Sequence, residues 1–165
     1  MSRRFIDDTL DPEPHFIQTP ADDLESFSWL LLWVVLKKLE QRTSKDDRSI
    51  FLSEMRMLRD LSANDLGKVQ LMKHFIALKK IPSLIQGESK SGVLSSSYLK
   101  PFAQLLTRWL SLAELKQGSQ QTLLGQQYGS PEEKMAECLS TLYADYDEFF
   151  AIGMHMLPTL GHAWP

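Results

Sequence analysis

The chain has 165 residues, of which 43% are hydrophobic and 24% charged, the size and composition of one globular domain with a sizeable core. Its formal net charge is −3 and its sequence pI is about 5.8, so no overall basic field attracts nucleic acid, and we expect no nucleic-acid partner. A single cysteine, Cys138, excludes an internal disulfide, and we expect it to be a buried apolar residue.

The first 18 residues differ in composition from the rest. They are rich in Asp and Pro, which favours extended backbone, so we expect residues 1–18 to form an irregular leading segment before a single helical domain over residues 19–165. Two arginines follow Met1, but acidic residues rather than an apolar run come after them, so no secretory signal is predicted. We therefore expect an intracellular location, cytoplasmic or nuclear.

The next stretch predicts a long helix over residues 20–42. Thr19 is a suitable N-cap, Pro20 fits the first helical position, and acidic residues at 22, 23 and 25 complement the positive end of the helix dipole. Between Phe27 and Leu36 only Ser28 is polar, so we expect neighbouring elements to cover this helix on all sides. The apolar run is only about half of the ~20 residues that span a bilayer, which predicts a core helix and no membrane contact.

Two amphipathic helices are predicted next, over residues 49–61 and from about 65 to 81. The first places Glu54, Arg56 and Arg59 on its solvated side. The second follows a cap at 63–65 and ends before Pro82. Residues 82–97, rich in Gly and Ser, predict a loop.

The C-terminal half predicts two further helices. The first covers about 97–117, with Pro101 in its first turn, and a polar loop over 118–129 follows. A capping box of Ser130 and Glu133, with Pro131 between them, begins a last helix over about 131–157 that stops before Pro158. Its inward face is predicted to consist of Met135, Cys138, Leu139, Leu142, Tyr146, Phe149 and Phe150. Because no stretch alternates with period two, the fold class is all-α, with about five main helices around the central helix 20–42.

Motifs for catalysis or metal binding do not occur in these residues. The four histidines, at positions 15, 74, 155 and 162, lack the spacing of metal ligands, and Cys138 has no histidine at helical spacing. No Gly-x-Ser-x-Gly and no glycine-rich phosphate loop is present. The acidic residues Asp145, Asp147 and Glu148 predict a solvated helix face rather than paired catalytic carboxylates. We expect no metal, no bound cofactor and no catalytic residue.

The start of the central helix carries the most specific signal. It reads Asp22-Asp23-Leu24-Glu25-Ser26 followed by Phe27-Ser28-Trp29-Leu30-Leu31-Leu32-Trp33. This stretch resembles the central helix of the C-terminal lobe of eukaryotic protein kinases, most of all casein-kinase-1-like kinases and the fungal-type protein kinases of mushroom-forming fungi. Residues 15–20 are similar to the segment that enters this helix in fungal-type kinases, and the later helices resemble the remaining C-lobe helices in pattern and order.

The resemblance implies roles for five residues. Asp23 corresponds to the aspartate that accepts backbone hydrogen bonds from the catalytic loop, and Ser26 is a second structural anchor beside it. Trp29, Leu32 and Trp33 correspond to the buried pillar. From the residues alone, Asp23 is interpreted as a plain helix-terminal charge and the two tryptophans as simple core aromatics.

Two interpretations follow. The glycine-rich loop, strand lysine, catalytic-loop Asp and Asn, and Asp-Phe-Gly of a kinase are not in these residues. The first interpretation is therefore a truncated fungal-type kinase C-lobe fragment, unable to transfer phosphate alone, whose intact parent would use ATP and Mg²⁺ to phosphorylate Ser/Thr. It predicts an uncovered apolar face around Trp29, Leu32 and Trp33, and hence self-association or a protein partner. The alternative is a self-contained helical adaptor, pseudokinase-like, whose helices close fully around residues 27–36.

Overall fold

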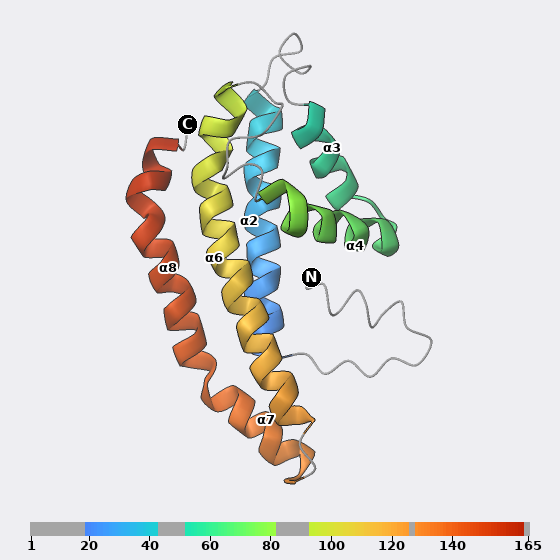
Figure 1. The fold of residues 1–165 in the computed structure, drawn as a ribbon, viewed down its shortest axis with the longest axis vertical. Helices are drawn as coiled ribbons and strands as arrows, with labels where there is room; N and C mark the ends of the chain where they lie inside the picture. The colour runs from blue at the N-terminus through green and yellow to red at the C-terminus, as the bar shows by residue number, and fades with distance from the viewer. Residues whose placement is uncertain (1–18, 43–51, 82–92, 126–127, 164–165) are drawn as a thin grey trace.

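A computed structural model describes residues 19–42, 52–81, 93–125 and 128–163 of the chain (Figure 1). These residues are helical apart from short connections and include no strand, which confirms the all-α prediction. None of the helices in these ranges combines the length and apolar character needed to cross a bilayer. The helices are α2 (Pro20–Arg42), α3 (Leu52–Leu61), α4 (Leu66–Phe75), the π-helical turn η2 (Ile76–Lys80), α6 (Val93–Leu124), α7 (Pro131–Ser140) and α8 (Leu142–Ala163).

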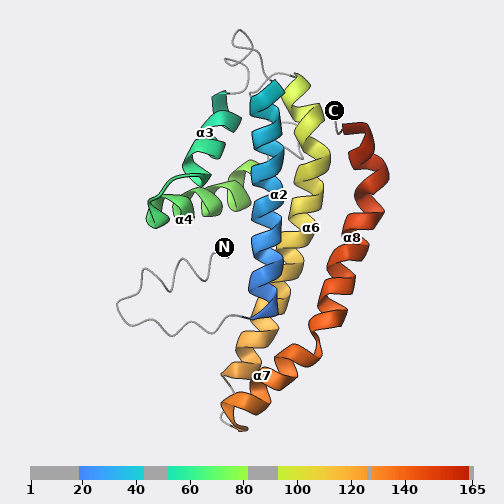
Figure 2. The ribbon, with the colours of Figure 1, turned by 180° about the vertical axis from the view of Figure 1, so that it is seen from behind.

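The helices α2 and α6 run side by side and form the centre of the molecule (Figures 1 and 2). On one side of this pair lie α3 and α4, and α8 packs along α6 on the other side. The main core joins α2, α3, η2 and α6 through residues that include Leu36, Met57, Ile76 and Leu106. A second core cluster joins α2, α6 and α8 through Leu24, Leu112, Ala113 and Phe149.

The central helix α2 has the predicted bounds but is not buried all round. Ser28, Leu32, Val35 and Leu36 are buried, whereas Phe27, Leu30 and Trp33 are 50%, 55% and 37% exposed. These three residues are spaced i, i+3, i+6 and so share one side of the helix, while α3, α6 and α8 cover other sides. We call Phe27, Leu30 and Trp33 the open stripe of α2.

The bounds of α6 differ from the prediction at both ends. It begins at Val93 and continues to Leu124, so residues 93–97 and 118–124 are helical rather than loop, and Pro101 lies inside the helix rather than in its first turn. Glycine and serine disfavour a helix by only about 1 kcal/mol or less, which packing overrides. Here Gln117 and Gln120, one turn apart, are both buried, and Gln117 hydrogen-bonds to Asp22 and Glu25 of α2.

The predicted last helix is two helices, α7 and α8, separated at Thr141, and Pro158 lies inside α8. At the break the hydroxyl of Thr141 donates to the carbonyl oxygen of Cys138 (3.1 Å). The capping box is confirmed, because Glu133 N–H donates to Ser130 Oγ (3.2 Å) and Ser130 N–H donates to Glu133 Oε2 (2.8 Å).

The predicted inward face of this segment is only partly correct. Cys138 and Phe149 are buried as predicted. Leu139 and Phe150 are 49% and 62% exposed, so their predicted burial is wrong. The predictions for residues 1–18 and 82–92 lie outside the residues that the structure describes.

Candidate functional site

The two aspartates that begin α2 occupy different environments. Asp22 is buried, and its carboxylate accepts hydrogen bonds from the backbone N–H and the hydroxyl of Thr19 (both 2.8 Å) and from Gln117 Nε2 (3.2 Å). Asp23, the anchor implied by the resemblance, is half-buried and accepts from the Tyr146 hydroxyl of α8 (3.4 Å). Ser26 donates within its own helix to the carbonyl oxygen of Asp22 (2.8 Å). In this structure Asp22 is thus the more deeply buried carboxylate.

The pKa of the Tyr146 hydroxyl is raised above its ordinary value. Burial is the larger cause, and the negative charge of the adjacent Asp23 carboxylate adds to it. Tyr146 therefore remains a neutral donor to Asp23 at physiological pH.

One turn further along α2, Glu25 is buried and binds one pillar residue, Trp29. It accepts from the Trp29 indole N–H (2.9 Å) and from Gln117 Nε2 (3.0 Å), so Gln117 of α6 bridges Asp22 and Glu25. The Lys73 ammonium of α4 lies 5.1 Å from the Trp29 ring centroid, a cation–π contact. This polar network joins α2, α4 and α6.

The three pillar residues do not share one environment. Trp29 and Leu32 are buried, as the resemblance implies, so the uncovered face is not around them. Trp33 is 37% exposed, and its predicted burial is wrong. Its indole N–H donates to Ser62 Oγ (3.0 Å), next to the C-terminal end of α3, which holds the ring at the edge of the core.

The acidic residues of α8 are also split. Asp145 is buried, which corrects the prediction of a solvated face, whereas Asp147 and Glu148 are exposed. Lys116 of α6 donates to Asp145 (2.8 Å) and to Glu148 (3.1 Å). The hydrogen bond with Asp145 is the main reason that the pKa of Lys116 is raised, against the opposing effect of burial. A hollow of about 380 Å³ between α6, α7 and α8 lies beside Lys116 and Asp145. Lys116 compensates one of the two carboxylate charges that it binds, which leaves a negative excess there.

A second hollow lies between α3 and α4, and we call it the α3–α4 groove. It has a volume of about 690 Å³ and is lined by Leu52, Arg56, Met57, Asp60, Lys68, Leu71, Met72 and Phe75. The apolar residues on its walls reach solvent, since Leu52, Leu71 and Phe75 are 65%, 72% and 46% exposed. Met57 is buried below them and Met72 is half-buried.

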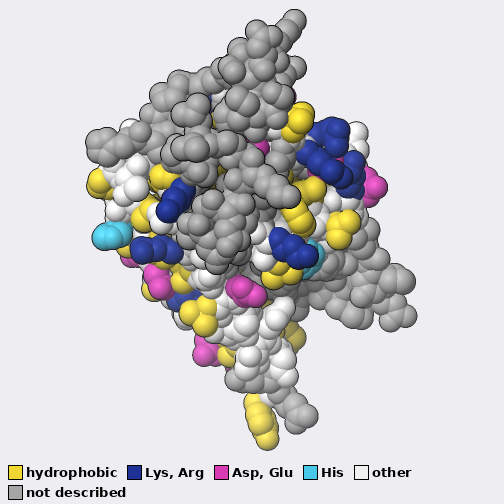
Figure 3. All heavy atoms as spheres, turned by 45° about the horizontal axis from the view of Figure 1, so that its top comes forward, with side chains coloured by type: hydrophobic (Ala, Val, Ile, Leu, Met, Phe, Trp, Pro, Cys, Tyr) yellow, Lys and Arg dark blue, Asp and Glu magenta, His cyan; other side chains and the backbone are white. Residues whose placement is uncertain are grey.

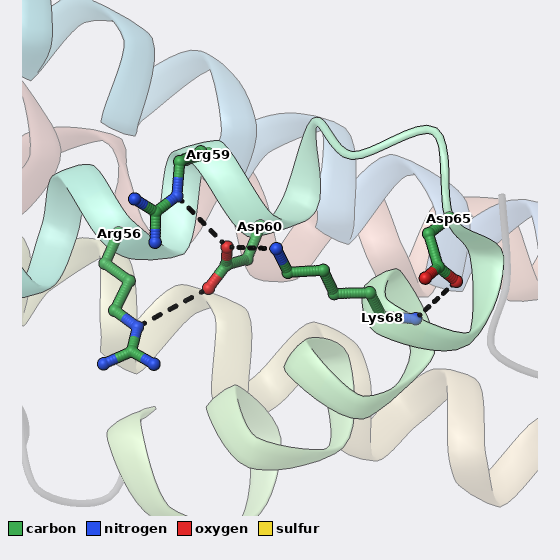
Figure 4. Close-up of polar contacts among 5 residues, drawn as sticks. All are labelled: Arg56, Arg59, Asp60, Asp65 and Lys68. Atoms are coloured by element: carbon green, nitrogen blue, oxygen red, sulfur yellow. Dashed lines mark hydrogen bonds and ion pairs between the residues drawn. The ribbon is translucent and has the colours of Figure 1, made fainter.

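One carboxylate holds three cations beside the groove (Figure 4). Asp60 is buried, and its Oδ1 lies 3.2 Å from Lys68 Nζ and 3.3 Å from Arg59 Nε, while its Oδ2 lies 3.7 Å from Arg56 Nε. Burial acts to raise the pKa of Asp60, but the hydrogen bonds and charges of Lys68 and Arg59 outweigh it, so this pKa is lowered. Asp60 therefore stays ionised and compensates one of three positive charges, which leaves a positive excess at the groove.

Local sequence explains this arrangement. Asp65 is the N-cap of α4 and accepts from Lys68 N–H (3.1 Å), which fixes the first turn that carries the Lys68 side chain (Figure 4). Arg56 and Asp60 are four residues apart on α3 and face each other across one turn. The sequence predicted that Glu54, Arg56 and Arg59 are solvated, which is correct for the two arginines but wrong for Glu54, which is buried. It did not identify Asp60. The i, i+4 spacing of Arg56 and Asp60 was the available signal.

The cysteine and the metal-ligand residue types form no further site in the described ranges. Cys138 is buried, and burial, with a smaller effect of Glu137, raises its pKa, so the thiol is not activated. Within those ranges no three His, Cys, Asp or Glu side chains come together as metal ligands. Comparisons of the chain with protein-family models, with curated proteins and with solved structures found no match.

Proposed function

We propose that this chain is a non-catalytic protein-interaction module whose helices derive from the C-terminal lobe of a fungal-type protein kinase. Its partner is an amphipathic, acidic helical segment that lies in the α3–α4 groove. The observation that carries this proposal is the combination of an exposed apolar lining with three cations that share one carboxylate.

The apolar lining supports a helical partner. Exposed large apolar side chains that surround a hollow are typical of interaction sites, and a groove of this kind accepts the apolar face of a helix. The volume of about 690 Å³ is within the range of roughly 300–1,000 Å³ typical of binding pockets. Met57 and Met72 on the floor are flexible enough to adapt to different side chains.

The charges specify an acidic partner. Residues 52–81 contain six Lys and Arg against three Asp and Glu, although the whole chain has a net charge of −3. Arg56, Arg59 and Lys68 are all at least half exposed, so a carboxylate of the partner can reach them. Figure 3 shows Lys and Arg side chains gathered beside hydrophobic ones on the side of the molecule where α3 and α4 lie.

A binding titration tests this function. A fluorescent designed helix, with leucines spaced at i, i+4, i+7 and i+11 and glutamates beside them, is titrated with the protein and followed by anisotropy. We expect saturable binding that Leu71→Gln with Phe75→Gln weakens about tenfold or more, because both side chains are exposed walls of the groove.

The matched control is Phe27→Gln with Leu30→Gln, which removes two exposed apolar side chains of α2 that are not in the groove lining. This control should leave the affinity unchanged. Equal losses in both double variants, or no saturable binding by the wild-type chain, would reject the groove as the binding site.

The kinase ancestry has separate support. The motif over residues 22–33 is the first support. The second is that one side of residues 27–36 is uncovered, as expected of a C-lobe fragment, although this side is the open stripe and not the predicted face around Trp29 and Leu32. A self-contained adaptor, the alternative, would cover that side. The stripe therefore favours the kinase-derived interpretation.

Sequencing the full transcript that encodes Met1 tests the ancestry. We expect an upstream reading frame, in the transcript or in its genomic neighbourhood, that contains a kinase catalytic loop and strand lysine. In such a frame Asp23 would be the residue to examine as the catalytic-loop anchor. If the neighbouring DNA has no kinase-like sequence, the adaptor interpretation replaces the ancestral one, and the binding function is unaffected.

A further inference from the structure

We propose that the segment bound in the α3–α4 groove is the outer face of α8 from a second copy of this chain. The proposal rests on the proposed function of the groove and specifies its partner. The two copies associate head to tail, with the groove of one and α8 of the other in contact.

The outer face of α8 has the pattern of a groove-binding helix. Four large apolar residues on it are exposed, namely Tyr143, Phe150, Met154 and Leu157, with exposed fractions between 51% and 81%. With the exposed Asp147 they occupy positions i, i+4, i+7, i+11 and i+14, which is one continuous stripe along a helix. We call these five residues the outer stripe of α8. The opposite side of the helix faces the interior of its own chain, because Phe149 and Met156 are buried.

The charges of the two surfaces are complementary. Within α8 the charged residues Asp145, Asp147 and Glu148 are all acidic, and the helix contains no Lys or Arg. Asp145 and Glu148 already bind Lys116, so Asp147 is the carboxylate that the outer stripe presents. Arg56 and Lys68 line the groove and Arg59 lies beside it, which gives the groove a positive excess over Asp60. The carboxylate of Asp147, in the middle of the outer stripe, is of the type that these cations bind.

The same charges disfavour symmetric pairing. Two copies joined through the outer stripe of α8 would bring Asp147 near its counterpart, and two copies joined through the groove would bring Arg and Lys against Arg and Lys. Like charges opposed at an interface are destabilising. Only the heterologous contact joins opposite charges.

The positions of the two surfaces make the contact intermolecular. The groove and α8 lie on opposite sides of the α2–α6 pair (Figures 1 and 2), so α8 cannot reach the groove of its own chain. A heterologous contact leaves one groove and one α8 free at the ends, so assemblies grow into rings or open chains rather than stopping at a dimer.

Sedimentation velocity at increasing protein concentration tests this arrangement. We expect the wild-type chain to form species larger than a dimer, and to associate less at about 0.5 M than at about 0.05 M salt, because the charged contacts are screened. Leu71→Gln with Phe75→Gln removes the groove walls, and Phe150→Gln with Met154→Gln removes the outer stripe. Each double variant alone should be monomeric at concentrations at which the wild type assembles.

Mixing the two double variants gives the decisive result. The groove variant retains an intact α8, and the α8 variant retains an intact groove. The mixture should therefore form a 1:1 heterodimer and nothing larger. The control Phe27→Gln with Leu30→Gln, on the open stripe of α2, should assemble like the wild type.

Other outcomes overturn the inference in distinct ways. If the groove variant still dimerises while the α8 variant does not, the interface is α8 against α8. Loss of assembly in the α2 control assigns the interface to the open stripe instead. If the wild type stays monomeric but its groove binds the designed peptide, the second-copy inference fails and the proposed function stands. If the peptide does not bind either, both fail.

Discussion

Replacing Phe149 with alanine is expected to lower the free energy of unfolding by about 3–5 kcal/mol, the usual cost of removing a buried phenylalanine side chain. Phe149 is 3% exposed and belongs to the core cluster that joins α8 to α2 and α6. Its ring stacks on Trp109 with centroids 4.1 Å apart, and it also contacts Phe27 at 6.4 Å. Urea unfolding followed by circular dichroism measures the loss.

The neighbouring residue is a matched control. Phe150 has the same side chain but is 62% exposed, so Phe150→Ala should change the free energy of unfolding by no more than about 0.5 kcal/mol, measured at a protein concentration at which the chain is monomeric. Equal costs for the two substitutions would contradict this orientation of α8.

Helix starts were predicted correctly from the sequence, but the buried side of α8 was not. The central helix and the start of α7 carry capping signals in their own residues, so Pro20 and the box of Ser130 and Glu133 fix these starts locally. The α8 helix is apolar on both sides, and hydrophobic periodicity cannot then determine which side faces the core. Packing against Trp109 and the core cluster of α2 and α6 distinguishes Phe149 from Phe150.

The polar sites were harder to predict for a related reason. A buried carboxylate such as Asp60 or Asp145 is stable only when it is paired, and for both residues one partner comes from another helix, which the sequence does not show. Lys116 lies on α6, and Lys68 belongs to a different helix from Asp60. An uncovered face of α2 was predicted, but it was placed around Trp29 and Leu32, because the apolar run does not show which side of the helix its neighbours cover.

Gln117→Leu is expected to lower the free energy of unfolding by about 2–4 kcal/mol, because two buried carboxylates lose a donor at once. Gln117 Nε2 lies 3.2 Å from Asp22 Oδ1 and 3.0 Å from Glu25 Oε2, more than 90 residues away in sequence. Leucine has a similar volume, so the loss comes from hydrogen bonding and not from a cavity. Urea unfolding of the variant measures it, with Gln121→Leu, an exposed glutamine of the same helix, as the control that should change little. A variant as stable as the wild type would mean that water replaces the amide between α2 and α6, and that this network does not hold the two central helices together.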